Sequence, residues 1–363
     1  LKGQESVGIY ANYGIINNNN IIDTQGKKSF GIFAVNGTDI VTAAGSIIKA
    51  GEEGAGIVAQ SYVLDPVTGT IVNSTYGDGT FKIDHSGEVI MSAGSNSFGI
   101  YADNNDTNVL TNTATRIVNL NVGSMIDMSG TTKGTALFAK KSTVNTVGDM
   151  KIGTDGIGIY AKDSNVNLTG GTMDILGSGS TGIFLDGTSN LAATSGVINV
   201  KADNTTVFFI NSLATTTGIE NIQINVDPNL KMTLANVKNT NFKYDGTLNG
   251  AGKGSVLIAG ENSAIMLDTN GNMGSTYENV VGLATKGGSA VNRGNLNLTG
   301  INSIGLYTEN ANAVNEGNVI LGANGVGVYN ENGTVINISG KIETGTNGIG
   351  IFGADSTSMT NNT

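Results

Sequence analysis

Short runs of alternating apolar and polar residues follow one another along the chain, and most runs end at Gly, Asn, Ser or Asp. Residues 295–298, which read Asn-Leu-Asn-Leu, are typical of these runs. Such period-2 spacing predicts β-strands joined by turns. The i, i+3, i+4, i+7 spacing of an amphipathic helix is not sustained anywhere in the sequence. We therefore predict an all-β fold.

One phrase, Gly-Ile-Tyr-Ala, recurs in register with these runs. Its versions begin at Gly8, Gly31, Gly56, Gly99, Gly158, Gly182, Gly305, Gly327 and Gly350. The most frequent spacing is about 23 residues, and each repeat holds three short strands. This arithmetic predicts a parallel β-helix, right-handed by the usual rule for parallel crossovers, with three strands and about 23 residues per coil and roughly fifteen coils. We expect residues 1–363 to form a single β-helix fragment of a longer solenoid.

The longer gaps between copies of the phrase mark departures from the period. Weaker copies begin at Ala136, Thr206, Ser255 and Gly282. The gaps of 43 residues (56 to 99) and 49 residues (206 to 255) are close to two periods, and the second leaves room for a further coil near residues 231–234. The gap of 37 residues (99 to 136) amounts to one coil plus about 14 extra residues. We predict insertions near 61–80, 103–120 and 267–279, the first as a protruding hairpin or a degenerate coil. Insertions into a solenoid lie on its surface, where partners often bind.

Strand alternation assigns the two faces of the repeated phrase. In residues 157–161 we expect Ile157, Ile159 and Ala161 to point into the core. Gly158 and Tyr160 should then face outward, with the ring covering the backbone that glycine leaves bare. The same logic predicts an outward aromatic file, which comprises Tyr10, Phe33, Tyr101, Phe138, Tyr160, Phe184, Phe208, Tyr307, Tyr329 and Phe352.

The aromatic file has two interpretations. It could be a stacking ladder that stabilises neighbouring coils, or a surface on which sugars or another chain bind. We take Tyr101, Tyr160, Tyr307 and Tyr329 as the candidate binding residues. Elsewhere, Asn292, Asn315 and Asn337 recur at matching positions in successive repeats, and we predict that their amides hydrogen-bond from coil to coil.

Composition narrows the range of partners. The chain has a net charge of −10, a pI near 4.6 and no Lys/Arg cluster. This composition argues against nucleic acid as a partner and against docking on an anionic membrane. The chain has no Cys, so disulfides and thiolate metal sites are excluded. It also has no apolar run long enough to span a bilayer, and we expect no membrane insertion.

No cofactor is expected. Residues 348–353 match the dinucleotide motif Gly-x-Gly-x-x-Gly, but no helix follows and the string recurs with the coil. Two stretches have the early spacing of a calcium-binding EF-hand loop but lack its central Gly and its bidentate Glu. They are Asp103/Asn105/Thr107 and Asp268/Asn270/Asn272. We interpret both as solvated turns and expect no metal; a structural ion in one of them is the alternative.

Catalysis is the rival class of function, because parallel β-helices include polysaccharide-cleaving enzymes. Such enzymes need carboxylates gathered on one face. Here the aspartates of the central repeats fall at different positions of the coil, namely Asp155, Asp163, Asp174 and Asp186. His85 is the only histidine, and it lies outside any nucleophile motif. We therefore predict that the protein is not an enzyme.

The repeated phrase, followed by Ser/Asn-x-Val-x-Asn, resembles the passenger domains of autotransporter adhesins. Residues 158–167 and 305–315 carry this resemblance, which is nearest to the very large fusobacterial type V adhesins of the RadD-like kind and is weak between Ala214 and Leu257. The resemblance implies export through a C-terminal barrel domain that this sequence does not contain, and display at the bacterial cell surface. It further implies adhesion to host receptors, glycans or other bacteria. A pure structural spacer is the third reading.

Overall fold

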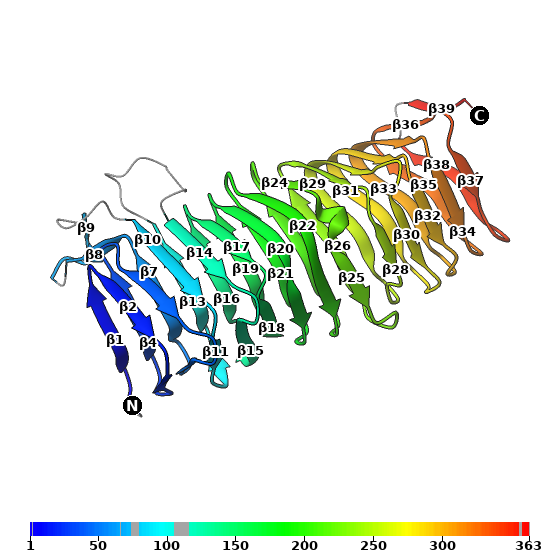
Figure 1. Cartoon of the computed structure of the whole chain (residues 1–363). Coiled ribbons are helices and arrows are strands. Elements are labelled where there is room, and N and C mark those ends of the chain that lie inside the picture. The colour runs from blue at the N-terminus through cyan, green and yellow to red at the C-terminus, as the bar shows by residue number, and fades with distance from the viewer. Residues whose placement is uncertain (2, 66, 74–79, 105–115, 356–357, 363) are drawn as a thin grey trace. The chain divides into compact units, whose positions relative to one another are not determined.

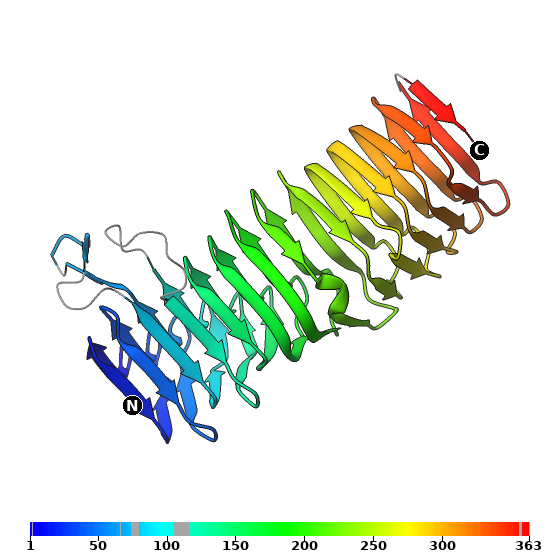
Figure 2. The same ribbon diagram turned by 45° about the horizontal axis from the view of Figure 1, so that its top comes forward.

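The computed structural model describes residues 1, 3–65, 67–73, 80–104, 116–355 and 358–362. The chain is an all-β solenoid of about 13 parallel turns with about 25 residues each, which confirms the predicted fold class. It divides into two compact units, Leu1–Ile198 and Asn199–Thr363. Figure 1 labels the strands and colours them in chain order. In each unit a coil contributes one strand to each of three stacks, and strands of successive coils pair in parallel (Figure 2).

The strands of the first unit fall into these three stacks, with one hairpin in addition. The first stack holds β1 (Val7–Asn12), β4 (Phe30–Val35), β7 (Ala55–Gln60), β13 (Phe98–Asp103), β16 (Thr135–Lys140), β19 (Ile157–Lys162) and β21 (Thr181–Asp186). The second holds β2 (Ile15–Asn18), β5 (Asp39–Thr42), β10 (Phe81–His85), β14 (Arg116–Leu120), β17 (Thr143–Thr146) and the start of β20 (Asn165–Ile175). The third holds β3 (Ile21–Thr24), β6 (Ile47–Ala50), β11 (Glu88–Met91), β15 (Met125–Thr132) with β12 (Gly94–Ser95), β18 (Asp149–Thr154) and the end of β20.

The second unit repeats the arrangement, and β22 (Asn190–Val200) runs across the boundary between the units. Its first stack holds β23 (Thr205–Asn211), β26 (Met232–Lys238), β29 (Val256–Leu267), β31 (Val281–Asn292), β33 (Ile304–Asn315), β35 (Val326–Glu331) and β38 (Ile349–Ala354). The long strands β29, β31 and β33 continue into the second stack, which also holds β24 (Thr215–Thr217), β27 (Asn241–Tyr244), β36 (Thr334–Asn337) and β39 (Ser358–Asn361). The third stack holds β25 (Gln223–Val226), β28 (Thr247–Asn249), β30 (Asn272–Ser275), β32 (Asn295–Leu298), β34 (Asn318–Leu321) and β37 (Lys341–Glu343), and a short 3₁₀ helix, η2 (Ile219–Asn221), precedes β25.

The core of each coil is a column of aliphatic side chains that stack on their counterparts in the next coil. In the first unit, Ile57 pairs with Ile100, Ile100 with Leu137, Leu137 with Ile159, and Ile159 with Ile183. All five side chains are fully buried. Burial of one such side chain contributes roughly 1.5–3 kcal/mol, so the repeated phrase supplies the main stabilising contact between coils.

The facing of the repeated phrase differs from the prediction at two positions. Ile159 and Ala161 are buried as expected, but Ile157 is only half-buried and Gly158 points inward. A Cβ on Gly158 would lie 2.5 Å from the carbonyl oxygen of Gly182 and 2.7 Å from Cδ1 of Ile152. Residues 158 and 159 both face the core, so the strict alternation is interrupted here. Glycine is required because the next coil's backbone fills the space of a side chain.

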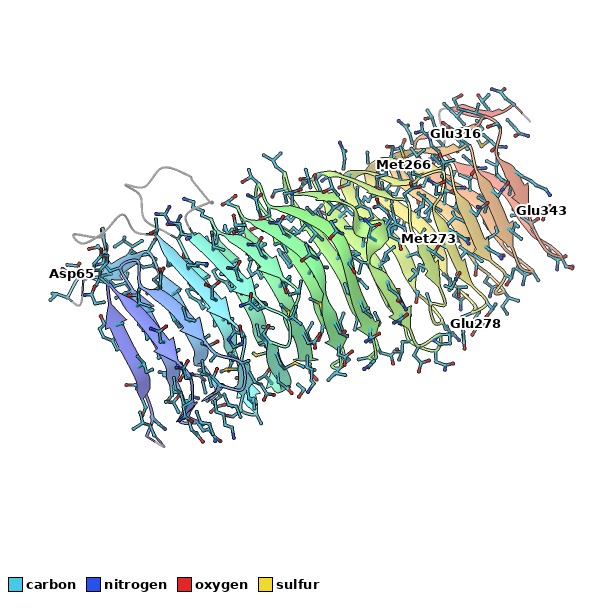
Figure 3. The ribbon with its side chains drawn as sticks, viewed as in Figure 1. Asp65, Met266, Met273, Glu278, Glu316 and Glu343 are labelled. Carbon is cyan, nitrogen blue, oxygen red and sulfur yellow. The ribbon has the colours of Figure 1, made fainter. Side chains whose placement is uncertain are left out.

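The long gaps have two different origins. Across the 43-residue gap β7 pairs directly with β13, so the gap is a single coil with an insertion and not two periods. Within that insertion, β8 (Tyr62–Leu64) and β9 (Ile71–Asn73) form an antiparallel hairpin, with Asp65 at the start of its turn (Figure 3). The 49-residue gap does contain the extra coil predicted near residue 232, whose first strand is β26.

The other two predicted insertions have different outcomes. β13 ends at Asp103 and the next described strand is β14, which pairs with β10 and β17; residues 105–115, which carry most of that prediction, lie outside the described residues. The segment 267–279 is an ordinary part of a coil, because β30 pairs in register with β28 and β32. Its Asp and Asn residues suggested a loop, but Asp268 and Asn270 occupy the regular turn between β29 and β30, and Asn272 begins β30.

The predicted asparagine ladder is present in the second unit. The Nδ2 atom of Asn292 donates to Oδ1 of Asn315 at 2.8 Å, and Asn315 donates likewise to Asn337 at 2.9 Å. All three side chains are buried. A second, half-buried ladder in the first unit joins Asn167 to Asn145 and Asn145 to Asn119, and it ends on the carboxylate of Asp84.

Candidate functional site

The outer face of the first stack presents three columns of side chains, one residue of each column per coil. The first column is formed by the residues in register with Ile157, which are Thr135 and Thr181 in the adjoining coils. The aromatic column is formed by the residues in register with Tyr160, and the ionic column by those in register with Lys162. Each column exists because pairing is in register, so equal positions of successive coils lie side by side.

The aromatic column of the first unit is a chain of touching rings. Tyr101 stacks on Phe138 with ring centroids 4.7 Å apart, whereas Tyr160 meets Phe138 and Phe184 edge-on at 5.3 and 4.7 Å. All four side chains are half-buried, so that part of each ring reaches solvent. Such pairs are worth about 0.5–1.5 kcal/mol each beyond the area they bury. The ring-to-ring contacts therefore agree with the interpretation of the aromatic file as a stacking ladder between neighbouring coils.

The second unit has its own aromatic column. Tyr307 stacks on Tyr329 at 5.3 Å, and Tyr329 on Phe352 at 5.1 Å. The preceding coils carry Ala259 and Ala284 at this position, so the column is interrupted there.

One member of the predicted aromatic file was assigned to the wrong face. Phe208 is fully buried in the core, and its neighbour Phe209 is the half-buried residue that pairs with Asn236 of the next coil. Phe208 is therefore the counterpart of Ile159, and Phe209 takes the place of Tyr160. The sequence has two adjacent phenylalanines here, so an error of one position exchanges the faces.

The ionic column pairs opposite charges from coil to coil. In the first unit, Lys162 lies 3.8 Å from Asp186. In the second, Lys238 is 2.7 Å from Glu261, and Lys286 is 2.7 Å from Glu309. Partly exposed pairs of this kind contribute little stability, typically 0–1 kcal/mol. Like charges also follow one another in this column, Lys140 beside Lys162 and Glu309 beside Glu331, so this edge of the face carries both signs of charge without strict alternation.

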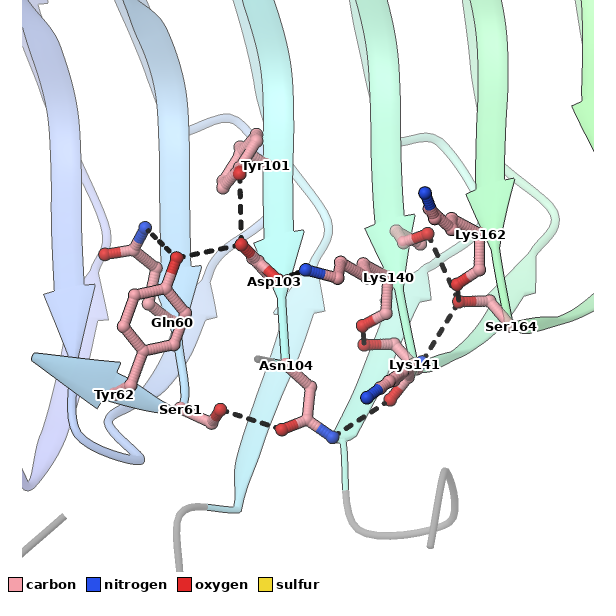
Figure 4. Close-up of polar contacts among 12 residues, drawn as sticks. Gln60, Ser61, Tyr62, Tyr101, Asp103, Asn104, Lys140, Lys141, Lys162 and Ser164 are labelled. Atoms are coloured by element: carbon pink, nitrogen blue, oxygen red, sulfur yellow. Dashed lines mark hydrogen bonds and ion pairs between the residues drawn. The ribbon is translucent and has the colours of Figure 1, made fainter. Parts of the chain in front are cut away.

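The ionic column is buried at one point in the first unit, around Asp103 (Figure 4). Asp103 accepts hydrogen bonds from the hydroxyls of Tyr62 at 2.8 Å and Tyr101 at 3.1 Å, and Lys140 lies 3.5 Å from its other oxygen. Burial, reinforced by the nearby carboxylate of Asp103, raises the pKa of both tyrosines well above the ordinary value. The hydroxyls therefore stay protonated and act as fixed donors.

Two further hydrogen bonds beside Asp103 join the start of the hairpin to residues that follow β13 and β16. Ser61, which precedes the hairpin, donates from its hydroxyl to Oδ1 of Asn104 at 2.8 Å (Figure 4). Asn104 in turn donates to the carbonyl of Lys141 at 3.3 Å. Tyr62 is the first residue of the hairpin, so the Asp103 cluster fixes it against the face of the solenoid.

The four candidate binding tyrosines are thus placed in two groups. Tyr101 and Tyr160 lie in the aromatic column of the first unit, and Tyr307 and Tyr329 lie in that of the second. Their rings touch aromatic neighbours, so much of each ring face is covered and the outer edges and hydroxyls remain for a ligand. A ligand would therefore contact the edges and hydroxyls of the rings and not their faces.

The residues considered for catalysis have structural partners. His85 is fully buried, its Nδ1 lies 2.7 Å from the Thr42 hydroxyl, and burial lowers its pKa to about 4. Asp163 accepts hydrogen bonds from the backbone N–H and the hydroxyl of Thr188. Asp155 occupies a left-handed turn position with φ 51°, and Asp174 lies in register with Lys151.

The candidate calcium residues are engaged in a similar way. Asp268 lies 2.9 Å from the ammonium of Lys243, and Asn270 donates to the carboxylate of Asp245 at 3.0 Å. Asn105 and Thr107 of the other predicted turn lie outside the described residues. Within the described part of the chain, no three acidic or histidine side chains gather as a metal site would require. The helices described there are too short or too polar to cross a membrane.

A polar groove in the second unit was not found by sequence reasoning. It has a volume of about 700 Å³ and is lined by η2, β25 and the residues from Asp245 to Asn249. The only trace in the sequence is that the repeated phrase fades between Ala214 and Leu257.

No protein-family model and no curated protein sequence matches this chain. Among solved structures it is similar to the A-module of mannuronan C-5 epimerase AlgE4 from Azotobacter vinelandii, at 12% identity and a TM-score of 0.25, over 97% of this chain and 91% of the other. It is also similar to the receptor binding domain of the tailspike of siphovirus 9NA, at 10% identity and a TM-score of 0.25, over 99% and 73% of the two chains. Likeness at this level assigns no activity.

Proposed function

We propose that this chain is a non-catalytic adhesive scaffold whose first stack binds glycan chains on another cell. The observation that carries the proposal is the repetition of outward aromatic and charged residues at matching positions of successive coils. A polysaccharide is itself a repeat, so successive sugars can meet successive coils. Weak contacts that are linked in this way add up to high avidity.

The chemistry of the face supports a sugar ligand. Ring edges supply apolar contact, while hydroxyl and charged groups beside them supply hydrogen bonds. Tyr160 illustrates the combination: its pKa is raised by burial and by Asp186, so its hydroxyl remains a donor over the physiological range. Polar groups beside apolar ones are what orient a ligand on a binding surface.

Non-catalytic action is supported by how the candidate groups are used. His85 is enclosed in the core, and Asp186 and Asp268 are ion-paired with lysines. A general acid or base must reach the substrate, and these groups are committed to holding coils together. Display at a bacterial surface, with a host receptor or a partner bacterium as the alternative target, follows from the resemblance to autotransporter adhesins and belongs to the same proposal.

Binding of the whole chain to glycan and cell-surface receptor arrays, with a polysaccharide-cleavage assay alongside, tests this function. Tyr160→Ala should weaken glycan binding, whereas Tyr13→Ala, at an exposed tyrosine outside the column, should not. Tyr160→Phe keeps the ring contacts and isolates the hydroxyl. Cleavage of any polysaccharide would overturn the non-catalytic assignment, and the absence of binding to every glycan and receptor would favour a pure spacer.

A further inference from the structure

The polar groove of the second unit lies where the third stack is interrupted. β28 is the last strand of a five-stranded sheet that continues through β30, β32, β34 and β37, and β25 is not part of that sheet. In the described part of the unit, no ladder therefore joins β25 to β28, although their coils are consecutive. The groove occupies the space between these two strands.

We propose that this groove is a binding site for an uncharged sugar unit. The proposal rests on the proposed glycan-binding function and specifies one ligand class and one location for it. Four outward side chains on the facing strands carry amide or hydroxyl groups: Gln223, Asn225, Thr247 and Asn249. They point outward because they alternate with the buried residues Ile224 and Leu248, as strand geometry requires.

Part of this amide set is held in place before any ligand arrives. Asn225 donates to Oδ1 of Asn199 at 2.8 Å, and Gln223 donates to Oδ1 of Asn225 at 3.0 Å. Fixed side chains lose less conformational entropy on binding, so their contacts with a ligand count for more. Amides offer a donor and an acceptor side by side, which matches the adjacent hydroxyls of a sugar.

The interrupted sheet adds backbone groups to the wall. The edge of β28 that faces β25 has no strand partner, so backbone groups of Asn249 face the groove, whereas the Thr247 carbonyl accepts a hydrogen bond from the Tyr244 hydroxyl at 3.2 Å. A cavity of about 700 Å³ is within the range of small-molecule sites, and it is walled by polar groups where most such sites are apolar. Hydroxyl-rich ligands are the class that such a wall recognises.

The charges around the groove select against acidic sugars. Glu220 and Asp245 line it, and its lining includes no lysine or arginine. The nearest lysine, Lys243, has its ammonium 2.9 Å from the carboxylate of Asp268. Asp268 is the main cause of the raised pKa of Lys243, and Asp245 and Glu220 add to it. A uronate or sialic acid would meet two carboxylates without a compensating cation. The groove is therefore specific for neutral sugars.

Calorimetric titration of the whole chain with three probe sets tests the proposal: neutral hexose, N-acetylhexosamine and uronate oligosaccharides. Asn249→Ala should weaken binding of the preferred neutral set about five- to tenfold, the effect of one or two lost hydrogen bonds. The matched control is Asn297→Ala, because Asn297 is exposed and occupies the same column two coils on. Glu220→Gln should raise the affinity for uronate probes.

The outcomes separate this proposal from the function on which it rests. If Tyr160→Ala weakens glycan binding while Asn249→Ala and Asn297→Ala both leave it unchanged, the groove is not a sugar site and the adhesive face stands. Equal loss from both asparagine variants, uronate binding as tight as neutral binding, or binding in the groove of an extended peptide and no sugar would each overturn the groove proposal. If no glycan binds the wild type, both fail.

Discussion

Asn315 both accepts a hydrogen bond from Asn292 at 2.8 Å and donates one to Asn337 at 2.9 Å, inside the second unit. Removing it takes the donor from Oδ1 of Asn337 and leaves Nδ2 of Asn292 with only the carbonyl of Asn318, at 3.3 Å. We predict that Asn315→Ala lowers the free energy of unfolding by about 2–4 kcal/mol, since each unsatisfied buried group costs roughly 1–3 kcal/mol. Urea unfolding should show this loss, while Asn318→Ala, in an exposed amide pair with Asn295, should cost under about 1 kcal/mol. Equal costs would show that the ladder is not buried as described.

The two isoleucines of the repeated phrase should respond very differently to charge. Ile159→Asp places an unpaired carboxylate in the core and should cost more than about 4 kcal/mol, if the variant folds at all. Ile157→Asp, on the half-buried outer side, should cost no more than about 2 kcal/mol, and Lys162→Asp less than about 1 kcal/mol. Thermal melts of the three variants decide the matter. If Ile157→Asp proved as damaging as Ile159→Asp, strict alternation would be right and the interruption at Gly158 wrong.

Gly158 should tolerate no side chain. In Gly158→Ala the new methyl group would lie 2.5 Å from the carbonyl oxygen of Gly182, which is backbone and cannot move aside easily. We expect a loss of about 1–3 kcal/mol, the usual cost of overpacking. Gly170→Ala is the control, because its nearest neighbour, Cγ1 of Val147, would be at 3.4 Å, close to an ordinary contact. The stability difference between the two variants measures the tightness of coil stacking directly.

The free energy of unfolding should fall as the pH is lowered, because His85 binds a proton less readily in the folded protein. Its pKa is lowered by burial from 6.5 to about 4, so the folded state binds fewer protons than the unfolded state between these values. The contribution is therefore complete above pH 6.5 and is lost as the pH falls towards 4, by up to about 3 kcal/mol. Urea unfolding from pH 7.5 to 4.5 should show this slope. His85→Leu, whose new side chain matches Leu120 of the next coil, should be flatter over the same range; an unchanged slope would assign the effect to carboxylates.

The Asp103 cluster should control the hairpin of β8 and β9. Asp103→Ala removes the acceptor of both tyrosine hydroxyls and the partner of Lys140. Hydrogen exchange in residues 62–73 should become faster by at least about tenfold, because a local contact worth over 1.4 kcal/mol is lost. Asp186→Ala, in the same ionic column but more exposed, should leave exchange in the hairpin unchanged. Loss of protection throughout the unit would instead indicate a general fold defect.

Much of the architecture could be predicted because it is periodic. The spacing of the repeated phrase predicted parallel coils, and the recurrence of Asn292, Asn315 and Asn337 predicted their hydrogen bonds. Both follow from the pairing register of the strands, because equal positions of successive sequence repeats pair with one another. The count of coils was slightly high, since the 43-residue gap holds one coil with a hairpin; hairpin residues and coil residues alternate in the same way.

Which residues of a strand point into the core was harder to predict where the sequence allowed either of two adjacent residues to do so. Glycine fits either side of a strand, so the inward position of Gly158 depends on the carbonyl of the next coil, which no local pattern reveals. Phe208 and Phe209 are chemically identical, and only the packing of the core distinguishes them. The groove was invisible for a different reason: Gln223 and Asn249 are far apart in sequence, and an absent ladder leaves no motif.

The buried amide ladder also bears on how the chain reaches its native state. Asn292, Asn315 and Asn337 present the same donor and acceptor, so a coil that paired with the wrong neighbour would still satisfy its hydrogen bonds. The ladder therefore enforces alignment within a coil pair but does not encode the order of coils. That order must come from connectivity, because each coil contacts only its neighbours along the chain. Assembly that spreads from one coil to the coil next to it in sequence, wherever it begins, avoids mispaired neighbours.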